Sequence, residues 1–362
     1  MDAVQSKNKR LLPYSLILFG MSFVIVGLGQ PERSAVLGLL SAACGYALFF
    51  ASLRTIQTAS RRFLAGAIWF FLVQLIHLSW MRSIEFQGYY ILFVYAGLCL
   101  LLALQFGALT LIVPREGSIS VRRMLLVASV WTLMEWVRVF PFCGFTWNPA
   151  GMALSSCILS IQFASIFGVL GLSFWVIFTN LTFLNWVRAH RDWNAAVLFI
   201  AIAGVPYVFG LFHLNQKTTT DAIPSIHAAL VQTHLLPSHK IPYPDRLDEY
   251  IPPLEQWKSI IVGLNEKQAW DLIVLPEGTV RYQSDLAAYW LKDVLLSLVE
   301  AYGPEVYLSL PPLRAPFAER RYAEGGWHWC VSNLFWCQAL CNIYRAELVI
   351  GLDHFERATE RY

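Results

Sequence analysis

Residues 271–277, DLIVLPE, are the stretch from which the fold of the C-terminal part of this chain can be read. Four apolar residues, two of them β-branched, predict a buried strand, and Pro276 ends it abruptly. Glu277 then stands at the carboxyl end of that strand. A carboxylate in this position suits a catalytic base, but it is equally an ordinary strand end, and the pattern alone leaves both interpretations open.

The segments on either side of this strand predict an α/β domain. Ile226–Val231 has the apolar pattern of a first buried strand, and Leu254, Trp257, Ile261 and Leu264 recur at the spacing of an amphipathic helix between the two strands. Further strands are predicted at Val306–Leu310 and Leu348–Leu352, and a helix at Leu334–Tyr344. Residues 215–362 are therefore expected to form an α/β domain.

The composition of the whole chain is that of a membrane protein. Of its 362 residues 57% are hydrophobic and only 14% charged, and there are 14 tryptophans. Such a chain cannot fold entirely as a soluble domain with a solvated surface. The net charge of +3 is small, and no basic block is interleaved with aromatic residues, so nucleic acid is excluded as a partner.

Residues 11–214 contain segments long enough to cross the roughly 30 Å of hydrocarbon in a bilayer as helices. They predict a polytopic α-helical membrane bundle of about seven transmembrane helices, preceded by a cytoplasmic N-terminus at residues 1–10. The predicted spans are Leu11–Gly29, Ala35–Leu53, Phe63–Trp80, Tyr90–Val113, Arg123–Val137, Ile158–Leu184 and Ala195–Leu214.

Basic residues in the short loops predict the orientation of this bundle. With a cytoplasmic N-terminus, the outer loops carry only Arg33, Arg82 and Arg138. Seven crossings then place residues 215–362 outside the cytoplasm, which for the inner membrane of a bacterium is the periplasm. The inner loops carry Lys7, Lys9, Arg10, Arg54, Arg61, Arg62, Arg115, Arg122, Arg123, Arg188 and Arg191.

Polar residues within the predicted spans allow two interpretations. Gln74, His77, Gln105 and Gln162 could line a transport path or form hydrogen bonds between helices, and the absence of a run of charges disfavours transport. Glu135 and Arg138 are three residues apart, so one helical turn brings them together as a pair. Trp131, Trp136 and Trp147 are expected in the headgroup region.

Two motifs resemble a known family, the bacterial apolipoprotein N-acyltransferases. One is the run of Trp131, Glu135, Trp136, Arg138, Gly144, Phe145 and Trp147. The other consists of Gln162, Ala164, Ser165, Gly168, Gly171, Leu172, Ser173, Phe174 and Asn180. The resemblance covers residues 120–280 best and weakens after Glu277.

This resemblance implies a nitrilase-like (carbon–nitrogen hydrolase) domain, an α-β-β-α sandwich, outside the membrane. Gln232 matches the glutamine that follows the family's first strand, and Glu277 matches the general base of a Glu-Lys-Cys triad. The implied reaction transfers an acyl chain from a membrane phospholipid, through a cysteine thioester, to the N-terminal diacylglyceryl-cysteine of an apolipoprotein. It needs neither a cofactor nor a metal.

The chain departs from the family pattern after Glu277. It lacks the Tyr-x-Lys and Cys-Tyr-Glu stretches that carry the other two triad residues, and Lys292, the only later lysine, is expected on a solvated helix face. Cys330, Cys337 and Cys341 are spaced to share one buried helix face, and a zinc site near His328 is disfavoured. Residues 285–330 are expected to be an insertion, and the chain a truncated member of the family.

Three functions therefore remain open from the sequence. The first is N-acyl transfer with Glu277 as the base. The second is a shortened, catalytically inactive member that lacks the lysine and cysteine of the triad. The third is a non-enzymatic membrane protein that binds partners or acts as a scaffold.

Overall fold

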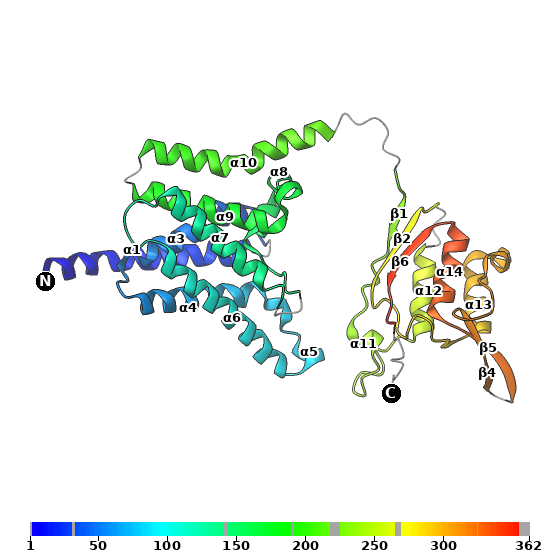
Figure 1. Cartoon of the computed structure of the whole chain (residues 1–362). Helices are drawn as coiled ribbons and strands as arrows, with labels where there is room; N and C mark the ends of the chain where they lie inside the picture. The colour runs from blue at the N-terminus through cyan, green and yellow to red at the C-terminus, as the bar shows by residue number, and fades with distance from the viewer. Residues whose placement is uncertain are drawn as a thin grey trace, which may run out of the picture. The chain divides into compact units, whose positions relative to one another are not determined.

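The computed structural model describes residues 2–30, 33–140, 144–189, 192–217, 225–264, 269–323 and 325–354, with side chains described from residue 13 and not at 217. The chain divides into two compact units, Met1–Asp221 and Ala222–Tyr362 (Figure 1). The first unit is helical and the second combines helices with two small sheets. Each unit is described by itself below.

Helices occupy all of the predicted membrane spans in the first unit. Five stretches are long and apolar enough to cross a membrane, Ala35–Thr55, Ala59–His77, Tyr90–Ile112, Ala164–Arg188 and Trp193–Gln216, and Pro13–Gly29 is a shorter apolar helix. These helices support the predicted membrane character, while the number of seven crossings stays a prediction. The elements are α1 (Asp2–Gly29), α2 (Ala35–Leu40), the π-helix η1 (Ser41–Gly45), α3 (Tyr46–Ser52), η2 (Leu53–Thr55), α4 (Ala59–His77), η3 (Ser79–Met81), α5 (Ile84–Gln87), α6 (Tyr90–Ile112), α7 (Val121–Val137), η4 (Ala150–Ser156), α8 (Ile158–Ile161), α9 (Ala164–Arg188) and α10 (Trp193–Lys217).

A π-helical turn interrupts the second span, and Asn180 from α9 fits against it. A π-turn shifts backbone groups away from their regular helical partners. The side-chain amide of Asn180 lies 2.8–3.1 Å from the carbonyl oxygens of Ser41, Ala42 and Val176, and its oxygen accepts from the Ala47 amide at 3.0 Å. Asn180 is fully buried, so it supplies partners that lipid cannot.

We expect Asn180→Leu to lower the free energy of unfolding by about 2 kcal/mol, because it removes these bonds and leaves backbone groups unpaired. Thermal unfolding of the chain in lipid nanodiscs measures the change. Gln162→Leu is the control, since the Gln162 amide bonds only the Ile158 carbonyl of its own segment, at 3.1 Å. Equal stabilities of the two variants would contradict the assigned role.

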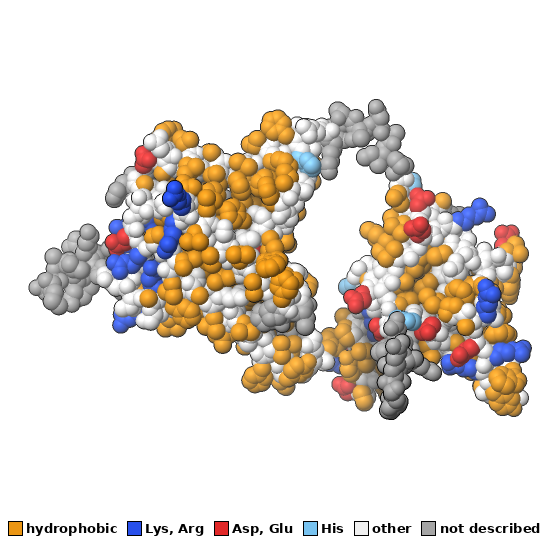
Figure 2. Space-filling view, viewed as in Figure 1, with side chains coloured by type: hydrophobic (Ala, Val, Ile, Leu, Met, Phe, Trp, Pro, Cys, Tyr) orange, Lys and Arg blue, Asp and Glu red, His pale blue; other side chains and the backbone are white. Residues whose placement is uncertain are grey.

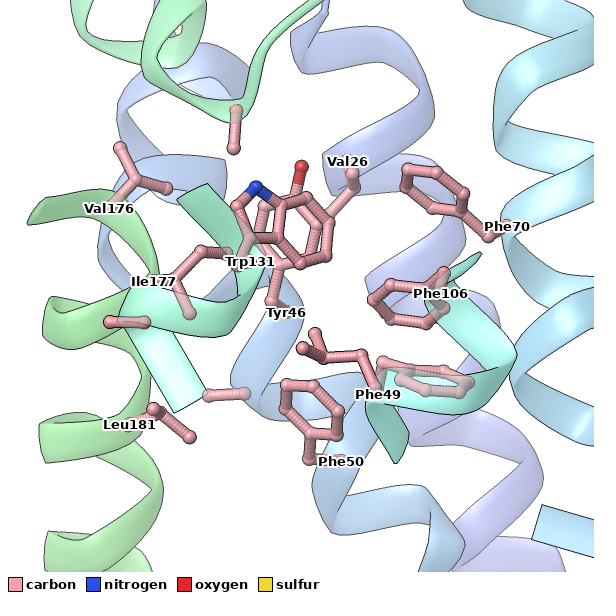
Figure 3. Packing of buried hydrophobic residues seen from close by; sticks show 14 of the residues in the cluster. Val26, Tyr46, Phe49, Phe50, Phe70, Phe106, Trp131, Val176, Ile177 and Leu181 are labelled. Atoms are coloured by element: carbon pink, nitrogen blue, oxygen red, sulfur yellow. The ribbon is translucent and has the colours of Figure 1, made fainter. Parts of the chain in front are cut away.

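Aromatic rings fill the core of the first unit, and Trp131 is one of them. Its ring lies edge-on to Tyr46 at 5.4 Å, Phe106 at 5.5 Å and Phe70 at 5.8 Å between centroids (Figure 3). The predicted headgroup position of Trp131 is therefore wrong. Its indole N–H is hydrogen-bonded and its ring is packed inside the bundle. The sequence of one helix could not predict this packing, because the partner rings lie on other helices.

Three of the basic loops meet at one end of the bundle. Arg62 donates to the Val113 carbonyl at 2.8 Å, Arg115 to that of Gln57 at 3.4 Å, and Arg188 to that of Pro114 at 2.8 Å. Figure 2 shows the blue side chains of this unit gathered at the end nearest the N-terminus, while orange side chains cover the rest of the visible face. The helices thus present an apolar surface with a cationic end.

The second unit is built around a parallel three-stranded sheet with the order β1-β2-β6. Its register pairs Ile273 with Ala229 on one side and with Leu348 on the other. A second, antiparallel sheet has the order β3-β5-β4. The elements are β1 (Ala228–Leu230), α11 (Pro237–Lys240), α12 (Pro253–Leu264), β2 (Leu272–Glu277), β3 (Tyr289–Trp290), α13 (Leu291–Tyr302), η5 (Pro304–Ser309), β4 (Ala318–Ala323), β5 (Gly326–Val331), α14 (Asn333–Tyr344) and β6 (Glu347–Gly351).

These elements confirm the predicted strands at 226–231, 271–277 and 348–352 and the helices at 254–264 and 334–344, within a few residues at each end. The strand predicted at Val306–Leu310 is wrong, because this segment forms the 3-10 helix η5 after Gly303. Val306 is buried and Leu308 exposed, whereas in a strand these two side chains would lie on the same face. The prediction that this unit is part of a nitrilase-like α-β-β-α sandwich stays a prediction.

One buried asparagine connects the core of this unit to the segment that follows β2. The Asn333 oxygen accepts from the Trp257 indole at 3.0 Å and from the Tyr289 hydroxyl at 2.8 Å. Its amide nitrogen donates to the carbonyls of Arg281 and Tyr282, both at 3.1 Å. Helices α12 and α14, which these bonds connect, lie on the same side of the parallel sheet (Figure 1). Because Asn333 also bonds Arg281 and Tyr282, it anchors the loop after Glu277 to the packed core.

Candidate functional site

Glu277 is the last residue of β2, the central strand of the parallel sheet, and its side chain is exposed. In open parallel sheets the carboxyl ends of the strands are the usual position of binding sites. Gln232 follows β1 at the same edge of the sheet, because the strands are parallel and the Val231 amide still bonds the Val274 carbonyl at 2.9 Å. The sheet therefore brings the two sequence-predicted residues to one edge.

The backbone at Glu277 is held against Gly351, its partner on β6. A Cβ atom at Gly351 would lie 2.8 Å from the Glu277 Cα and 3.1 Å from its Cβ, so only glycine fits here. Gly278 has a positive φ of 60° and donates to the Gly351 carbonyl at 3.1 Å. The backbone thus turns directly after Glu277, and Gly278 and Gly351 permit this turn.

We expect Gly351→Ala to lower the free energy of unfolding of this unit by about 1–3 kcal/mol, because the methyl group overlaps the β2 backbone at Glu277. Chemical denaturation followed by tyrosine and tryptophan emission measures the effect. Gly263→Ala on α12 is the control, since its added methyl group meets nothing within 4 Å. The prediction fails if Gly351→Ala is as stable as this control.

Three polar side chains surround the same edge. The Lys240 ammonium donates to the Gly278 carbonyl at 2.7 Å. The Ser284 hydroxyl lies 3.1 Å from Nδ1 of His354, and the Ser284 amide donates to the Asp353 carbonyl at 2.7 Å. Sequence reasoning missed all three, because no spacing connects Ser284 with a histidine 70 residues later.

The residues that the sequence offered for the rest of the triad lie elsewhere. Lys292 is an exposed residue of α13, which confirms the predicted solvated face. Cys337 and Cys341 lie on α14, but Cys330 lies on strand β5, so the prediction that all three share one helix face is wrong. The spacing suggested a helix, but Cys330 belongs to a hairpin that ends at Ser332, just before α14 begins.

Burial makes these cysteines poor nucleophiles. It raises the pKa of the Cys337 thiol to about 12 and raises the pKa of Cys330 and of Cys341 above its ordinary value. A thiol attacks as its thiolate, and these thiols stay protonated near neutral pH. Within the parts of the chain that the structure describes, no group of three or more His, Cys, Asp or Glu side chains could hold a metal ion.

A second polar cluster lies inside the helical unit, around Glu135. Its Oε1 accepts from the Trp131 indole at 2.7 Å and from the Ala150 amide at 2.8 Å, and Arg138 lies 3.5 Å from it. Both charged side chains are buried. This confirms the predicted pairing of Glu135 with Arg138, and it shows that the carboxylate also fixes the start of η4.

The polar residues of the spans are mostly used in hydrogen bonds. His77 Nε2 lies 3.0 Å from the Val26 carbonyl, and the Asn148 amide donates to Gln74. Gln162 bonds its own segment, as described above. These contacts favour a role in helix packing over a transport path.

Comparison with known proteins agrees with both motifs. Residues 24–182 match the model of the apolipoprotein N-acyltransferase N-terminal domain. The chain is 26% identical to the apolipoprotein N-acyltransferase of Chlamydia pneumoniae over 94% of this chain and 59% of that protein. It is also 26% identical to the enzyme of that name from Chlamydia trachomatis over 93% of this chain and 58% of the relative, and 29% identical to that of Rickettsia bellii over 47% and 32%.

The chain spans about 60% of the length of the chlamydial relatives that it matches. The match to each of them covers both units, including Glu277 and the segment after it, and the family model lies within the helical unit. In its helical unit the chain is thus similar to the N-terminal domain of the apolipoprotein N-acyltransferases, and over nearly its whole length it is similar to the chlamydial members of that family.

Proposed function

We propose that the chain takes part in the phospholipid-dependent N-acylation of the N-terminal diacylglyceryl-cysteine of lipoproteins, with Glu277 as the general base. The observation that carries this proposal is the position of Glu277, an exposed carboxylate at the carboxyl end of the central parallel strand. The unit that holds it is covalently joined to apolar helices, from which a phospholipid is accessible. The names of the relatives agree with this chemistry.

In the proposed reaction, the carboxylate takes the proton of a cysteine thiol other than those of Cys330, Cys337 and Cys341, and the thiolate attacks the ester carbonyl of the phospholipid. A thioester forms, and the lysophospholipid leaves with the proton. The amine of the lipoprotein then attacks the thioester, which gives the amide and returns the thiol. A lysine ammonium stabilises the oxyanion in both steps, and Lys240 is held beside Glu277 with donors left for another acceptor.

The basic loops support a membrane orientation in which the unit with Glu277 lies outside the cytoplasm, as this function requires. Because Arg62, Arg115 and Arg188 meet at one end of the bundle, that end fits the cytoplasmic side of a bacterial inner membrane. With seven crossings, the unit with Glu277 then faces the periplasm. Protease accessibility of this unit in spheroplasts tests the orientation, and protection of the unit would contradict it.

A second candidate function is binding of lipid and lipoprotein without turnover. The observation that favours it is the burial of Cys330 and Cys337 and the partial burial of Cys341, which keep their thiols protonated. None of these three cysteines supplies the activated nucleophile that the reaction needs. The two candidates differ in whether acyl transfer depends on this chain.

We expect that incubating the 362-residue chain alone with acyl-labelled phosphatidylethanolamine gives no hydroxylamine-sensitive label, because its described periplasm-side thiols are not activated. A thioester is cleaved by hydroxylamine, so loss of label on treatment is the diagnostic measurement. A labelled band that disappears in Cys337→Ser or Cys341→Ser would overturn this expectation. A chain carrying both substitutions is the matched blank for non-specific labelling.

A further inference from the structure

The hairpin of β4 and β5 extends beyond the sheet to which it belongs. Strand β3 pairs only with Cys330 and Val331 at the base of the hairpin. The part from Arg320 to Ala323 and from Gly326 to Trp329 pairs only with itself. Figure 1 shows this part as a two-stranded arm that projects from the α/β unit.

The end of this arm carries aromatic side chains that nothing in the described unit covers. Tyr322 and Trp327 are cross-strand partners, with ring centroids 5.7 Å apart, and each is 65% exposed. Trp329 lies two residues further along the same face, and the Arg320 guanidinium lies 5.3 Å from its ring. Figure 2 shows orange side chains at the end of the arm with blue ones just above them.

Exposed aromatic residues grouped at the end of a projecting arm indicate a partner surface. Tryptophan and tyrosine are the residues that concentrate at the boundary between lipid and water, where the ring meets the acyl chains and its N–H or O–H meets headgroups. An arginine beside them can reach a lipid phosphate while its stem stays in apolar surroundings. The arm has all of these parts on one face.

The charges of the arm exclude a partner that is bound by charge attraction alone. Residues 318–331 contain two acids, Glu319 and Glu324, and two arginines, Arg320 and Arg321, so their formal charges cancel. Arg321 is moreover paired with Glu319. An arm of zero formal charge is not built for nucleic acid or for attraction to anionic lipid.

A short segment connects this unit to a helix that is long and apolar enough to cross a membrane. Only ten residues, 218–227, separate the end of α10 from β1, and ten extended residues span at most about 35 Å. Helix α10 belongs to an apolar stretch long enough to cross a membrane. The connection to this helix therefore favours a bilayer as the partner surface.

We propose that the β4–β5 arm binds the lipid–water interface, with Tyr322, Trp327 and Trp329 among the headgroups and upper acyl chains and Arg320 at a lipid phosphate. This contact is separate from catalysis and does not depend on Glu277 acting as a base. It anchors the α/β unit to the bilayer at a second point besides its covalent connection to α10.

The test places a photo-reactive benzoylphenylalanine at position 327 in the full chain, reconstituted in phosphatidylcholine vesicles. The control carries the same group at Val262 on α12, which is 69% exposed in the same unit. After irradiation, mass spectrometry measures the lipid adduct on each peptide. We expect several-fold more lipid adduct at 327 than at 262, and equal yields or crosslinks to protein alone at 327 would overturn the proposal.

The lipid composition gives a second test. Because the formal charge of the arm is zero, replacing a third of the phosphatidylcholine by phosphatidylglycerol is expected to leave the adduct yield at 327 unchanged. A yield that rises with anionic lipid would overturn the interfacial mode of binding. Amide exchange of residues 318–331 tests the proposal without the photo-reactive group. In the native chain we expect slower exchange in vesicles than in detergent, and in the double variant Tyr322→Ser/Trp327→Ser equal exchange in both. Equal exchange in the native chain would also overturn the proposal.

Discussion

Glu277→Gln is expected to lower the rate of lipoprotein N-acylation by about 10² to 10⁴-fold in cells whose N-acylation depends on this chain, because this is the usual contribution of a positioned general base. Glutamine keeps the shape of the side chain and removes its capacity to accept a proton. The exposed position of Glu277 at the end of β2 means that the substitution leaves the packing of the sheet intact. Mass spectrometry of the N-terminal lipopeptides measures the triacylated fraction over time.

Glu347→Gln is the matched control for this experiment. Glu347 is also an exposed carboxylate of the parallel sheet, but it lies at the opposite end of the strands, opposite Leu272. We expect it to keep the native rate. If Glu277→Gln also keeps the native rate, Glu277 is not the base; if the native chain supports no N-acylation at all, binding without turnover is the better description.

The second large effect is expected in the membrane unit. Glu135→Ala should lower the free energy of unfolding by about 3–5 kcal/mol, because it leaves the Arg138 charge buried without its partner. It also removes the acceptor for the Trp131 indole and the Ala150 amide. Thermal unfolding in nanodiscs and protease resistance at 37 °C are suitable measurements.

Two variants separate the causes of this loss. Glu135→Gln keeps an oxygen for Trp131 and Ala150 and removes only the charge, so it is expected to cost less than the alanine variant. Glu116→Ala is the surface control, since the pair of Glu116 with Arg115 is largely exposed and should contribute less than about 1 kcal/mol. A Glu135→Ala protein as stable as this control would refute the structural role of the buried pair.

Most helices and strands could be predicted from the sequence, because the hydrophobic pattern of each can be recognised from residues that are close together in the chain. The apolar runs of the spans and the strand before Glu277 need only neighbouring residues for their interpretation, and the structure has helices and a strand there. The pairing of Glu135 with Arg138 could be predicted for the same reason, since three residues are one helical turn. A short apolar run such as Val306–Leu310 is compatible with a strand or a helix, and the structure has a 3-10 helix there.

Contacts over long sequence distances could not be predicted. The headgroup position was expected for Trp131 because tryptophan concentrates there, and only the rings of Tyr46, Phe70 and Phe106 show that it faces the core. Lys240 and His354 reach the edge beside Glu277 from distant segments, and no motif predicts them. The sequence could therefore predict only the position of the two residues at or just after the ends of strands, Glu277 and Gln232.

The bond network of Asn180 has a consequence for biogenesis. The amide of Ala47 and the carbonyls of Ala42 and Ser41 in the π-turn leave the ribosome 133, 138 and 139 residues before their partner Asn180. At a synthesis rate of about 5–20 residues per second, the second span waits roughly 7 to 27 s in the membrane before Asn180 exists. We expect this span to be inserted as a regular α-helix and to acquire its π-turn only when α9 arrives, so that the final shape of an early span is decided by a late one.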